Sequence, residues 1–267
     1  MEAHDGLSAA IAERAGFKGL WASSLSIACS LSYRDAAEVS CSQLLRVVER
    51  IVGSTELPVL VDGDTGFDDF NSARSLARKL HQRGAAGVAL EDSCFPKMNS
   101  LFGERPLADI NEFSGRLRAV KDTVADDLVL VARIETFIGA HGIDETILRA
   151  HAYADAGADA ILIHSRKSTA DEILWFVHAW RNRLPVVIVP TKYDRTPLSA
   201  YRNARISAVI WANHSMQAAI AAMRQVDDRI ITEENTVNTE LDIATLDEFF
   251  ELFMYDELAR SEARAPY

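Results

Sequence analysis

Cysteine, basic residues and long apolar runs are all scarce in this sequence. It has three cysteines among 267 residues, and no two of them show the C-x-x-C spacing. This count argues against a disulfide framework or a thiolate zinc site, and it predicts a cytoplasmic protein. Residues 1–5 lack the basic and apolar parts of a secretory signal peptide. No apolar run approaches the roughly 20 residues that a membrane-spanning helix needs.

The deficit of basic residues restricts the kind of partner. Lysine and arginine number 28 against 39 aspartates and glutamates, so the formal net charge is −11. Nucleic acid and anionic membranes are bound through an excess of basic residues, so neither is an expected partner. An anionic small molecule remains a possible substrate if local basic groups or a bound metal make the potential at its site positive. The hydrophobic share of 48% and charged share of 25% are typical of a folded globular chain.

Short apolar runs alternate with helical patterns along the whole chain. The runs are rich in Val, Ile and Leu with little alternation, which is typical of strands buried on both faces. Such runs separated by helices predict an α/β fold, and this length suits one TIM-type (β/α)₈ barrel. Seven strands are expected, at residues 17–22, 58–61, 87–90, 128–132, 160–163, 186–189 and 207–211.

A closed barrel needs eight strands, so the count implies that the first strand is truncated, its place lying just before Glu2. Helical patterns between the strands include residues 71–83 and 143–156, and a glycine follows each of them. From residue 241 to 264 the pattern is helical and acidic. We therefore predict one barrel domain over residues 1–267, with 240–267 as terminal helices that pack on a neighbouring subunit.

Polar side chains follow several strands where they end. Asp62 and Asp64 follow one strand and lie two residues apart, so they point the same way. Glu91, Arg133 and His164 end the next three strands. Active sites of this fold lie at the carboxyl ends of the strands, where these side chains would meet. Three carboxylates without a thiolate favour a hard cation such as Mg²⁺.

Some of these residues have plain structural alternatives. Asp62 and Asp64 could only cap the following helix or pair with Arg74. Asp35, after the second strand, is either a catalytic carboxylate or the N-cap of a helix near residue 36. The irregular stretch 91–106 is expected to be a lid over the barrel mouth, or else a solvated loop. Lys192 is a weaker candidate at another strand end.

Longer motifs carry a resemblance to one known family. With them the sequence resembles the phosphoenolpyruvate mutase family, within the isocitrate lyase/phosphoenolpyruvate mutase superfamily, over nearly the whole chain. DGDTG alone would indicate only the superfamily. The motifs are EAHDGLS at 2–8, GFKGLW at 16–21, DGDTG at 62–66, LED at 90–92, FPKMNS at 95–100, VARIE at 131–135, HS at 164–165 and WANH at 211–214.

The resemblance implies a (β/α)₈ barrel whose last helix is exchanged between subunits of a dimer-of-dimers homotetramer. It implies a Mg²⁺ ion held by Asp62, with Asp64 and Glu91 acting partly through water. The implied reaction is the reversible, intramolecular interconversion of phosphoenolpyruvate and phosphonopyruvate. That step makes the carbon–phosphorus bond of natural phosphonates.

The same resemblance gives roles to the other candidate residues. Arg133 and His164 would bind and neutralise the phosphoryl group, and Asp35 would lie beside it as it migrates. Four residues would surround the substrate: Trp21, Ser23, Ser24 and Leu25. Three others would belong to the gating loop: Lys97, Asn99 and Ser100.

Other functions in the superfamily stay open as alternatives. Phosphonopyruvate hydrolases carry Thr where this sequence has Asn99, so the loop favours the mutase. The carbon–carbon lyases carry a K-K-C-G-H motif that this sequence lacks, although lyases of other 2-oxo acids remain an alternative. A truncated, inactive homologue that binds phosphoenolpyruvate is the non-enzyme hypothesis. Ser24 and Asp68 stand where the family has glycine, and a positive φ at residue 24 would strain the serine.

Overall fold

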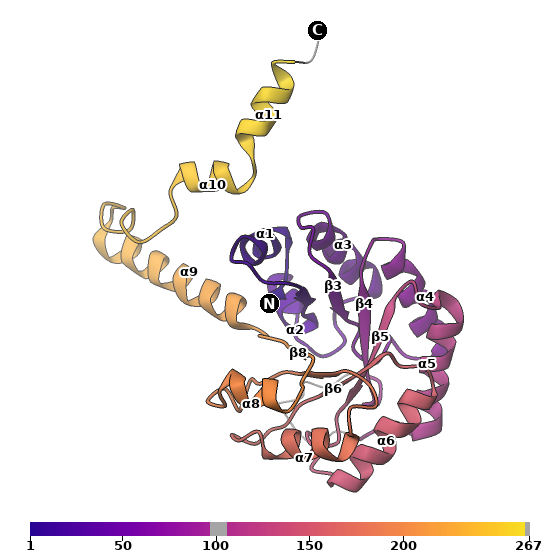
Figure 1. The fold of residues 1–267 in the computed structure, drawn as a ribbon. Coiled ribbons are helices and arrows are strands. Elements are labelled where there is room, and N and C mark those ends of the chain that lie inside the picture. The colour runs from indigo at the N-terminus through magenta and orange to yellow at the C-terminus, as the bar shows by residue number, and fades with distance from the viewer. Residues whose placement is uncertain (97–105, 265–267) are drawn as a thin grey trace. The chain divides into compact units, whose positions relative to one another are not determined.

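The computed structural model describes residues 1–96 and 106–264. Within these residues, eight parallel strands form one sheet in which each strand pairs with its neighbours in chain order (Figure 1). Helices alternate with the strands and cover the outer face of the sheet, which matches a (β/α)₈ fold. The strands are β1 (Glu2–Ala3), β2 (Leu20–Ala22), β3 (Val59–Asp62), β4 (Gly87–Glu91), β5 (Val129–Ile134), β6 (Ala160–Ile163), β7 (Val186–Ile188) and β8 (Ala208–Val209).

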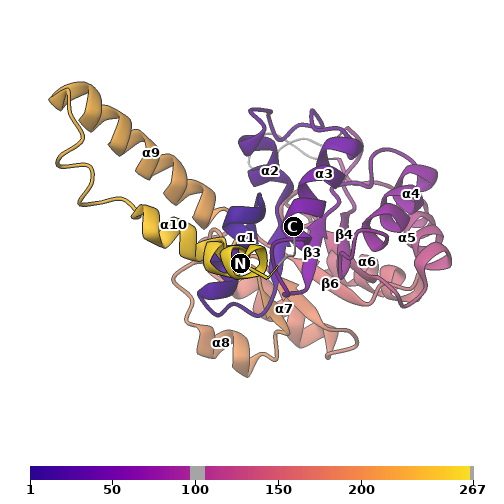
Figure 2. The ribbon, with the colours of Figure 1, turned by 90° about the horizontal axis from the view of Figure 1, so that it is seen from above.

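Several helices begin at a side chain that caps them. Asp5, Ser40 and Asp69 each accept a hydrogen bond from the backbone N–H three residues later. Successive helices from α3 to α7 contact one another around the sheet, as Figure 2 shows. The helices are α1 (Gly6–Arg14), α2 (Ser24–Ser30), α3 (Cys41–Val52), α4 (Phe70–His81), α5 (Ile110–Val124), α6 (Ile143–Asp155), α7 (Asp171–Trp180), α8 (Leu198–Asn203), α9 (His214–Glu233), α10 (Leu246–Leu252) and α11 (Tyr255–Glu262).

The first strand is present at Glu2–Ala3, not before Glu2 as the count of seven implies. Glu2 pairs with Trp21, and Ala3 pairs with Ala22. The Glu2 N–H also donates to the carbonyl of Trp211, just after β8, over 3.0 Å. The backbone of this strand therefore bonds on both sides, and the expected gap between the second and eighth strands is filled. A run of two residues is too short to show a hydrophobic pattern, which is why the sequence does not reveal it.

The apolar core lies on both faces of the sheet. Along β5, Leu130 and Ala132 pack under the helices, whereas Val131 belongs to the cluster inside the barrel. Burial on both faces accounts for the continuous apolar runs of the sequence. The interior cluster consists of Trp21, Ala89, Val131, Ala160, Leu162, Val187, Ile210 and Ala212.

The chain divides into two compact units, Met1–Asn213 and His214–Tyr267. The first holds the eight strands and helices α1 to α8. The second holds α9 to α11, and many of its large apolar side chains are exposed, among them Leu246, Phe249 and Leu258. In the part of the chain that the structure describes, no helix is long and apolar enough to cross a membrane.

A buried ion pair holds the first strand to the start of α1. Nδ1 of His4 lies 2.6 Å from Oε1 of Glu2, and both side chains are buried. Burial lowers the pKa of His4, but the hydrogen bond and charge of Glu2 outweigh it, so the pKa lies above its usual value of 6.5. The stabilisation is therefore complete below pH 6.5 and is lost as the pH rises through the folded-state pKa.

His4→Gln is expected to lower the free energy of unfolding by about 1–3 kcal/mol at pH 6, because it removes a partner of a buried carboxylate. The loss should shrink as the pH rises toward 9, when the wild-type histidine is neutral. Urea unfolding at several pH values measures both curves, and His81→Gln, at the exposed end of α4, is the control. A difference between wild type and His4→Gln that stays constant with pH contradicts the ion pair.

Candidate active site

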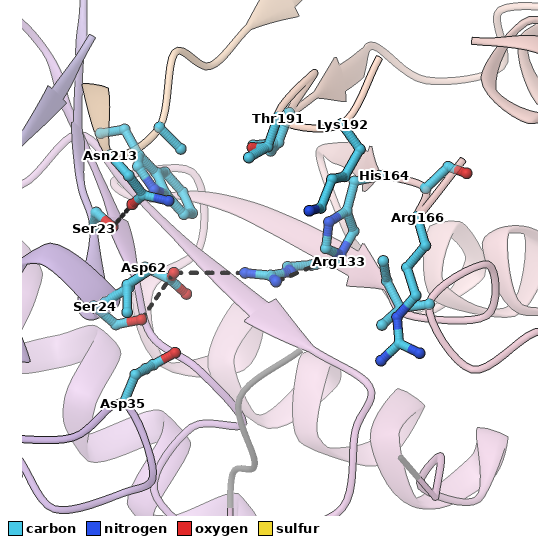
Figure 3. A pocket seen from close by; sticks show the side chains of 16 residues that line it. Ser23, Ser24, Asp35, Asp62, Arg133, His164, Arg166, Thr191, Lys192 and Asn213 are labelled. Atoms are coloured by element: carbon cyan, nitrogen blue, oxygen red, sulfur yellow. Dashed lines mark hydrogen bonds and ion pairs between the residues drawn. The ribbon is translucent and has the colours of Figure 1, made fainter. Parts of the chain in front are cut away.

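A cavity of about 90 Å³ opens at the carboxyl ends of the strands (Figure 3). Catalytic sites of (β/α)₈ barrels lie at this face. The structure brings eight of the sequence-predicted residues into the wall of this cavity. They are Trp21, Ser23, Ser24, Leu25, Asp35, Asp62, Arg133 and His164.

Arg133 is the charged centre of the cavity wall. Its Nε lies 2.6 Å from Oε1 of Glu135 and 3.5 Å from Oε2 of Glu91, and its Nη1 lies 3.5 Å from Oδ2 of Asp62. The guanidinium is 8% exposed. Burial lowers the pKa of Arg133, but the three carboxylates outweigh it and hold the pKa well above its usual value. A permanent positive charge therefore faces the cavity.

Glu135 is a residue that the sequence analysis does not assign to the site. It is fully buried, and the same Oε1 that accepts from Arg133 lies 2.6 Å from Nε2 of His164. One carboxylate thus orients both Arg133 and His164. The signal in the sequence is spacing, because residues 133 and 135 are two apart and point to the same face of the extended chain. Arg166, Thr191 and Asn213 also line the cavity without having been predicted.

Asn213 holds the turn between β2 and α2 in place. Its Oδ1 accepts hydrogen bonds from the hydroxyls of Ser26 at 3.2 Å and Ser23 at 3.4 Å. Ser23 is also the N-cap of α2. Ser24, the first residue of α2, donates from Oγ to Oδ2 of Asp62 over 3.0 Å (Figure 3). Its φ is not positive, so the strain considered for a serine at this position does not arise.

The DGD turn at 62–64 joins the ends of β3 and β4. A Cβ on Gly63 would lie 2.8 Å from side-chain carbons of both Val88 and Leu90, so only glycine fits against β4 here. The Asp64 N–H donates to Oδ1 of Asp62 over 3.3 Å, and its carbonyl accepts from the N–H of Glu91 over 2.8 Å. Asp64 therefore links the two strand ends through its backbone.

The three expected metal ligands do not form a ready-made cage. Among the described residues, no group of three or more His, Cys, Asp or Glu side chains is arranged to hold an ion. Arg133 supplies the reason, because it contacts both Asp62 and Glu91. The donors are all oxygen atoms, and Mg²⁺ takes only one or two carboxylates directly and keeps several waters. Asp62, in the cavity wall, fits such an ion as a direct ligand.

The remaining candidates divide into two groups. Asp35 lies in a turn before α3, whose N-cap is Ser40, so the alternative role of Asp35 as the cap of a helix near residue 36 is wrong. Lys192, the weaker candidate, does line the cavity (Figure 3). Three predicted loop residues lie outside the described residues: Lys97, Asn99 and Ser100.

Comparisons with known proteins agree with the geometry. The family model described as phosphoenolpyruvate phosphomutase matches residues 1–231. A phosphoenolpyruvate phosphomutase of Tetrahymena pyriformis is 48% identical over 99% of this chain and 89% of its own length. The crystal structure of the phosphoenolpyruvate phosphomutase from Streptomyces platensis subsp. rosaceus gives a TM-score of 0.96 at 38% identity, covering 98% of this chain and 92% of that one.

A second activity is found among the solved relatives. The crystal structure of a phosphonopyruvate hydrolase in complex with oxalate and Mg²⁺ gives a TM-score of 0.92 at 35% identity, covering 99% of this chain and 92% of that one. The mutase and the hydrolase share this fold. The family model and the 48% identity to the Tetrahymena protein both favour the phosphomutase. The chain belongs to the phosphoenolpyruvate phosphomutase family.

Proposed function

We propose that this chain interconverts phosphonopyruvate and phosphoenolpyruvate by moving the phosphoryl group within one molecule. In the direction of phosphoenolpyruvate, the carbon–phosphorus bond breaks and a phosphorus–oxygen bond forms on the enolate oxygen. The carbon atom that loses phosphorus becomes the methylene of phosphoenolpyruvate, so no water enters the balance. The observation that carries the proposal is the buried Arg133 guanidinium, aligned by Glu135 beside His164 in the cavity wall.

The reaction needs fixed positive charge where the phosphoryl group travels. Phosphoryl transfer passes through a loose, metaphosphate-like state with charge spread over three oxygens. Preorganised donors stabilise such charge because they need no rearrangement during the reaction. Arg133 has five N–H donors: Nε donates to Glu135 over 2.6 Å, whereas Nη1 lies 3.5 Å from Oδ2 of Asp62 and Nη2 lies 3.5 Å from Nε2 of His164. The Nη groups and His164 are thus placed to bind phosphoryl oxygens, and Asp35 lies across the cavity from them (Figure 3).

A divalent cation fits the charge of this wall. We propose Mg²⁺, held by Asp62 directly and by Asp64 and Glu91 through water, and the related hydrolase with Mg²⁺ and oxalate supports this. When bound, the ion would neutralise carboxylate and enolate charge on the substrate. Ser24 fixes one oxygen of Asp62 and so sets the direction of that carboxylate. Trp21 and Leu25 supply apolar wall on which the carbon skeleton can rest.

Exclusion of water separates the mutase from the hydrolase, because water that captures the migrating phosphoryl group yields phosphate and pyruvate. On the sequence motif alone, we assign Lys97, Asn99 and Ser100 to the substrate, with Asn99 favouring the mutase. We also propose a cytoplasmic location, to which the free thiols of Cys29, Cys41 and Cys94 are suited.

The purified protein is expected to convert phosphonopyruvate to phosphoenolpyruvate when Mg²⁺ is present and to lose this activity in EDTA. ³¹P NMR follows substrate and product directly. Phosphate and pyruvate in place of phosphoenolpyruvate would establish the hydrolase and overturn the argument from Asn99. Binding of phosphoenolpyruvate that raises the melting temperature without turnover would establish the inactive homologue.

Glu135→Gln is expected to lower kcat about 10- to 100-fold, because a neutral amide cannot balance the charge of Arg133 and accepts a weaker hydrogen bond from it. Steady-state kinetics with phosphonopyruvate measure the effect. The control is Glu112→Gln on α5. It removes an exposed carboxylate that pairs with the buried Arg116, so it tests the loss of an arginine–glutamate pair elsewhere in the chain. Equal kcat values for wild type and Glu135→Gln would show that Glu135 has no part in orienting Arg133 and His164 for the reaction.

We also propose that residues 240–267 pack on a neighbouring subunit of a dimer-of-dimers homotetramer. Phe249, Phe250, Phe253 and Met254 are between 42% and 60% exposed, which is unusual for clustered large apolar side chains. The ring of Phe249 lies against those of Phe250 and Phe253, with centroids 6.3 Å and 5.1 Å apart. An aromatic cluster of this kind is suited to a contact between identical chains.

Phe250→Glu combined with Phe253→Glu is expected to reduce the mass of the assembly, since two buried charges would oppose the contact. Sedimentation velocity of the full chain measures the mass of each variant. Leu148→Glu, at an exposed apolar position of α6, is the matched control. A wild-type protein that sediments as a monomer contradicts the proposed assembly.

A further inference from the structure

Asp92 is a buried carboxylate that does not line the cavity. It follows Glu91 at the end of β4 and is 0% exposed. Its Oδ1 accepts a hydrogen bond from the backbone N–H of Glu135 over 2.8 Å. Its Oδ2 accepts from Nη1 of Arg149 over 3.1 Å and from the Tyr153 hydroxyl over 2.8 Å. Both oxygens are therefore satisfied, one toward β5 and one toward α6.

Arg149 and Tyr153 extend this network from α6 to the segment that leads into α5. They lie one helical turn apart, and Nη1 of Arg149 also lies 2.9 Å from the Tyr153 hydroxyl. The same Nη1 donates to the carbonyl of Ala108 over 3.0 Å. The N–H of Ala108 in turn donates to the carbonyl of Asp92 over 2.8 Å. One carboxylate thus joins the ends of β4 and β5, helix α6 and residue 108.

Stability alone does not account for a network of this composition. Burying a carboxylate and a guanidinium costs several kcal/mol of desolvation for each ion, and apolar side chains of the same volume often stabilise a core as well or better. Burial raises the pKa of Asp92 to about 6, against the opposing charge of Arg149 and the hydrogen bonds from Glu135 and Tyr153. What the pair does supply is directional bonding that fixes where its partners lie.

The partner that matters for the reaction is Glu135. Asp92 fixes the backbone N–H of Glu135, and the side chain of that residue reaches Arg133 and His164, each at 2.6 Å. The path from Asp92 to Arg133 and His164 thus runs through a single residue. A shift of the Glu135 backbone would lengthen both short contacts at once, because both use Oε1.

We infer that Asp92 is a positioning residue for phosphoryl transfer, which holds Glu135 so that Arg133 and His164 stay aligned in the cavity. Arg149 and Tyr153 act through Asp92 by fixing its second oxygen. The expected loss of kcat rests on the proposed function. The placement of Glu135 by Asp92 rests on the hydrogen bonds alone. Asp92 itself touches neither the cavity nor the substrate.

The test compares Asp92→Asn and Tyr153→Phe with Glu145→Gln. Asp92→Asn keeps the size of the side chain, and Tyr153→Phe removes only one hydroxyl donor. Glu145→Gln removes the other carboxylate of the same guanidinium, 2.8 Å from Nε of Arg149 at the outer end of the network. It leaves all contacts of Asp92 in place, so it controls for any general effect of disturbing Arg149.

Asp92→Asn is expected to lower kcat by up to about 100-fold, the loss known for a misplacement of about 1 Å at a reacting centre. Tyr153→Phe should lower kcat about 3- to 10-fold, since one of three donors to Asp92 is lost. The KM for Mg²⁺ should change less than kcat in both, because the side-chain hydrogen bonds of Asp92 run to Glu135, Arg149 and Tyr153 and to none of the side chains proposed to hold the metal. Glu145→Gln should match wild type throughout.

Amide hydrogen exchange supplies a readout that does not depend on turnover. The N–H of Glu135 should exchange faster in Asp92→Asn and Tyr153→Phe than in wild type and Glu145→Gln. Wild-type protein without turnover would overturn the proposed function, and the exchange rates would still decide the structural inference. Active wild type together with unchanged kcat and unchanged exchange in Tyr153→Phe would overturn the inference alone. If Glu145→Gln lost as much kcat as Asp92→Asn and Tyr153→Phe, the network would have only a stabilising role. That result would overturn the inference as well.

Discussion

The buried guanidinium of Arg133 is the constraint on which the rest of the site depends. An isolated charge at 8% exposure would be prohibitively costly, so carboxylates must surround it, and Asp62, Glu91 and Glu135 do so from three successive strands. Three carboxylates facing one guanidinium leave an excess of negative charge. A bound divalent cation would offset this excess for an anionic substrate, which is the physical argument for the proposed Mg²⁺ in a chain of net charge −11.

The parallel sheet makes this arrangement possible with little backbone distortion. Adjacent strands in register end at one level, and side chains at alternate positions point into the same space. Glu91 pairs in register with Arg133 across β4 and β5, so their side chains meet without any loop to place them. Near the cavity, positive φ values occur in the turn after β3, at Asp64 (51°) and Asp68 (109°), and after β8, at Asn213 (69°). Asp68 stands in a conformation that suits glycine, so the turn there stores strain.

The sequence predicts the strands that show an apolar pattern and the polar residues that follow them. It does not predict features that are defined only by contacts between residues far apart in the chain. The continuous apolar runs gave seven of the eight strands, and the polar residues that follow them gave Asp62, Arg133 and His164, which lie in one cavity. The strand Glu2–Ala3 has no pattern to detect, and only its bonds to β2 and Trp211 define it. In the sequence, Glu135 is likewise one more charged residue after a strand. Its role depends on its contacts with Arg133 and His164, which only the structure shows.

The cavity wall combines charged and apolar side chains, and both kinds suit the proposed substrate. Asp62, Arg133 and His164 supply charged parts, on the ends of β3, β5 and β6. Trp21, Leu25, Val189 and Ala212 supply apolar parts of the same wall. A phosphoryl group that leaves carbon for oxygen must stay bound to the charged parts while the three-carbon skeleton stays in contact with the apolar ones. Catalysis of this kind is positioning more than covalent chemistry, so the buried bonds that align Arg133 matter as much as the residues that meet the substrate.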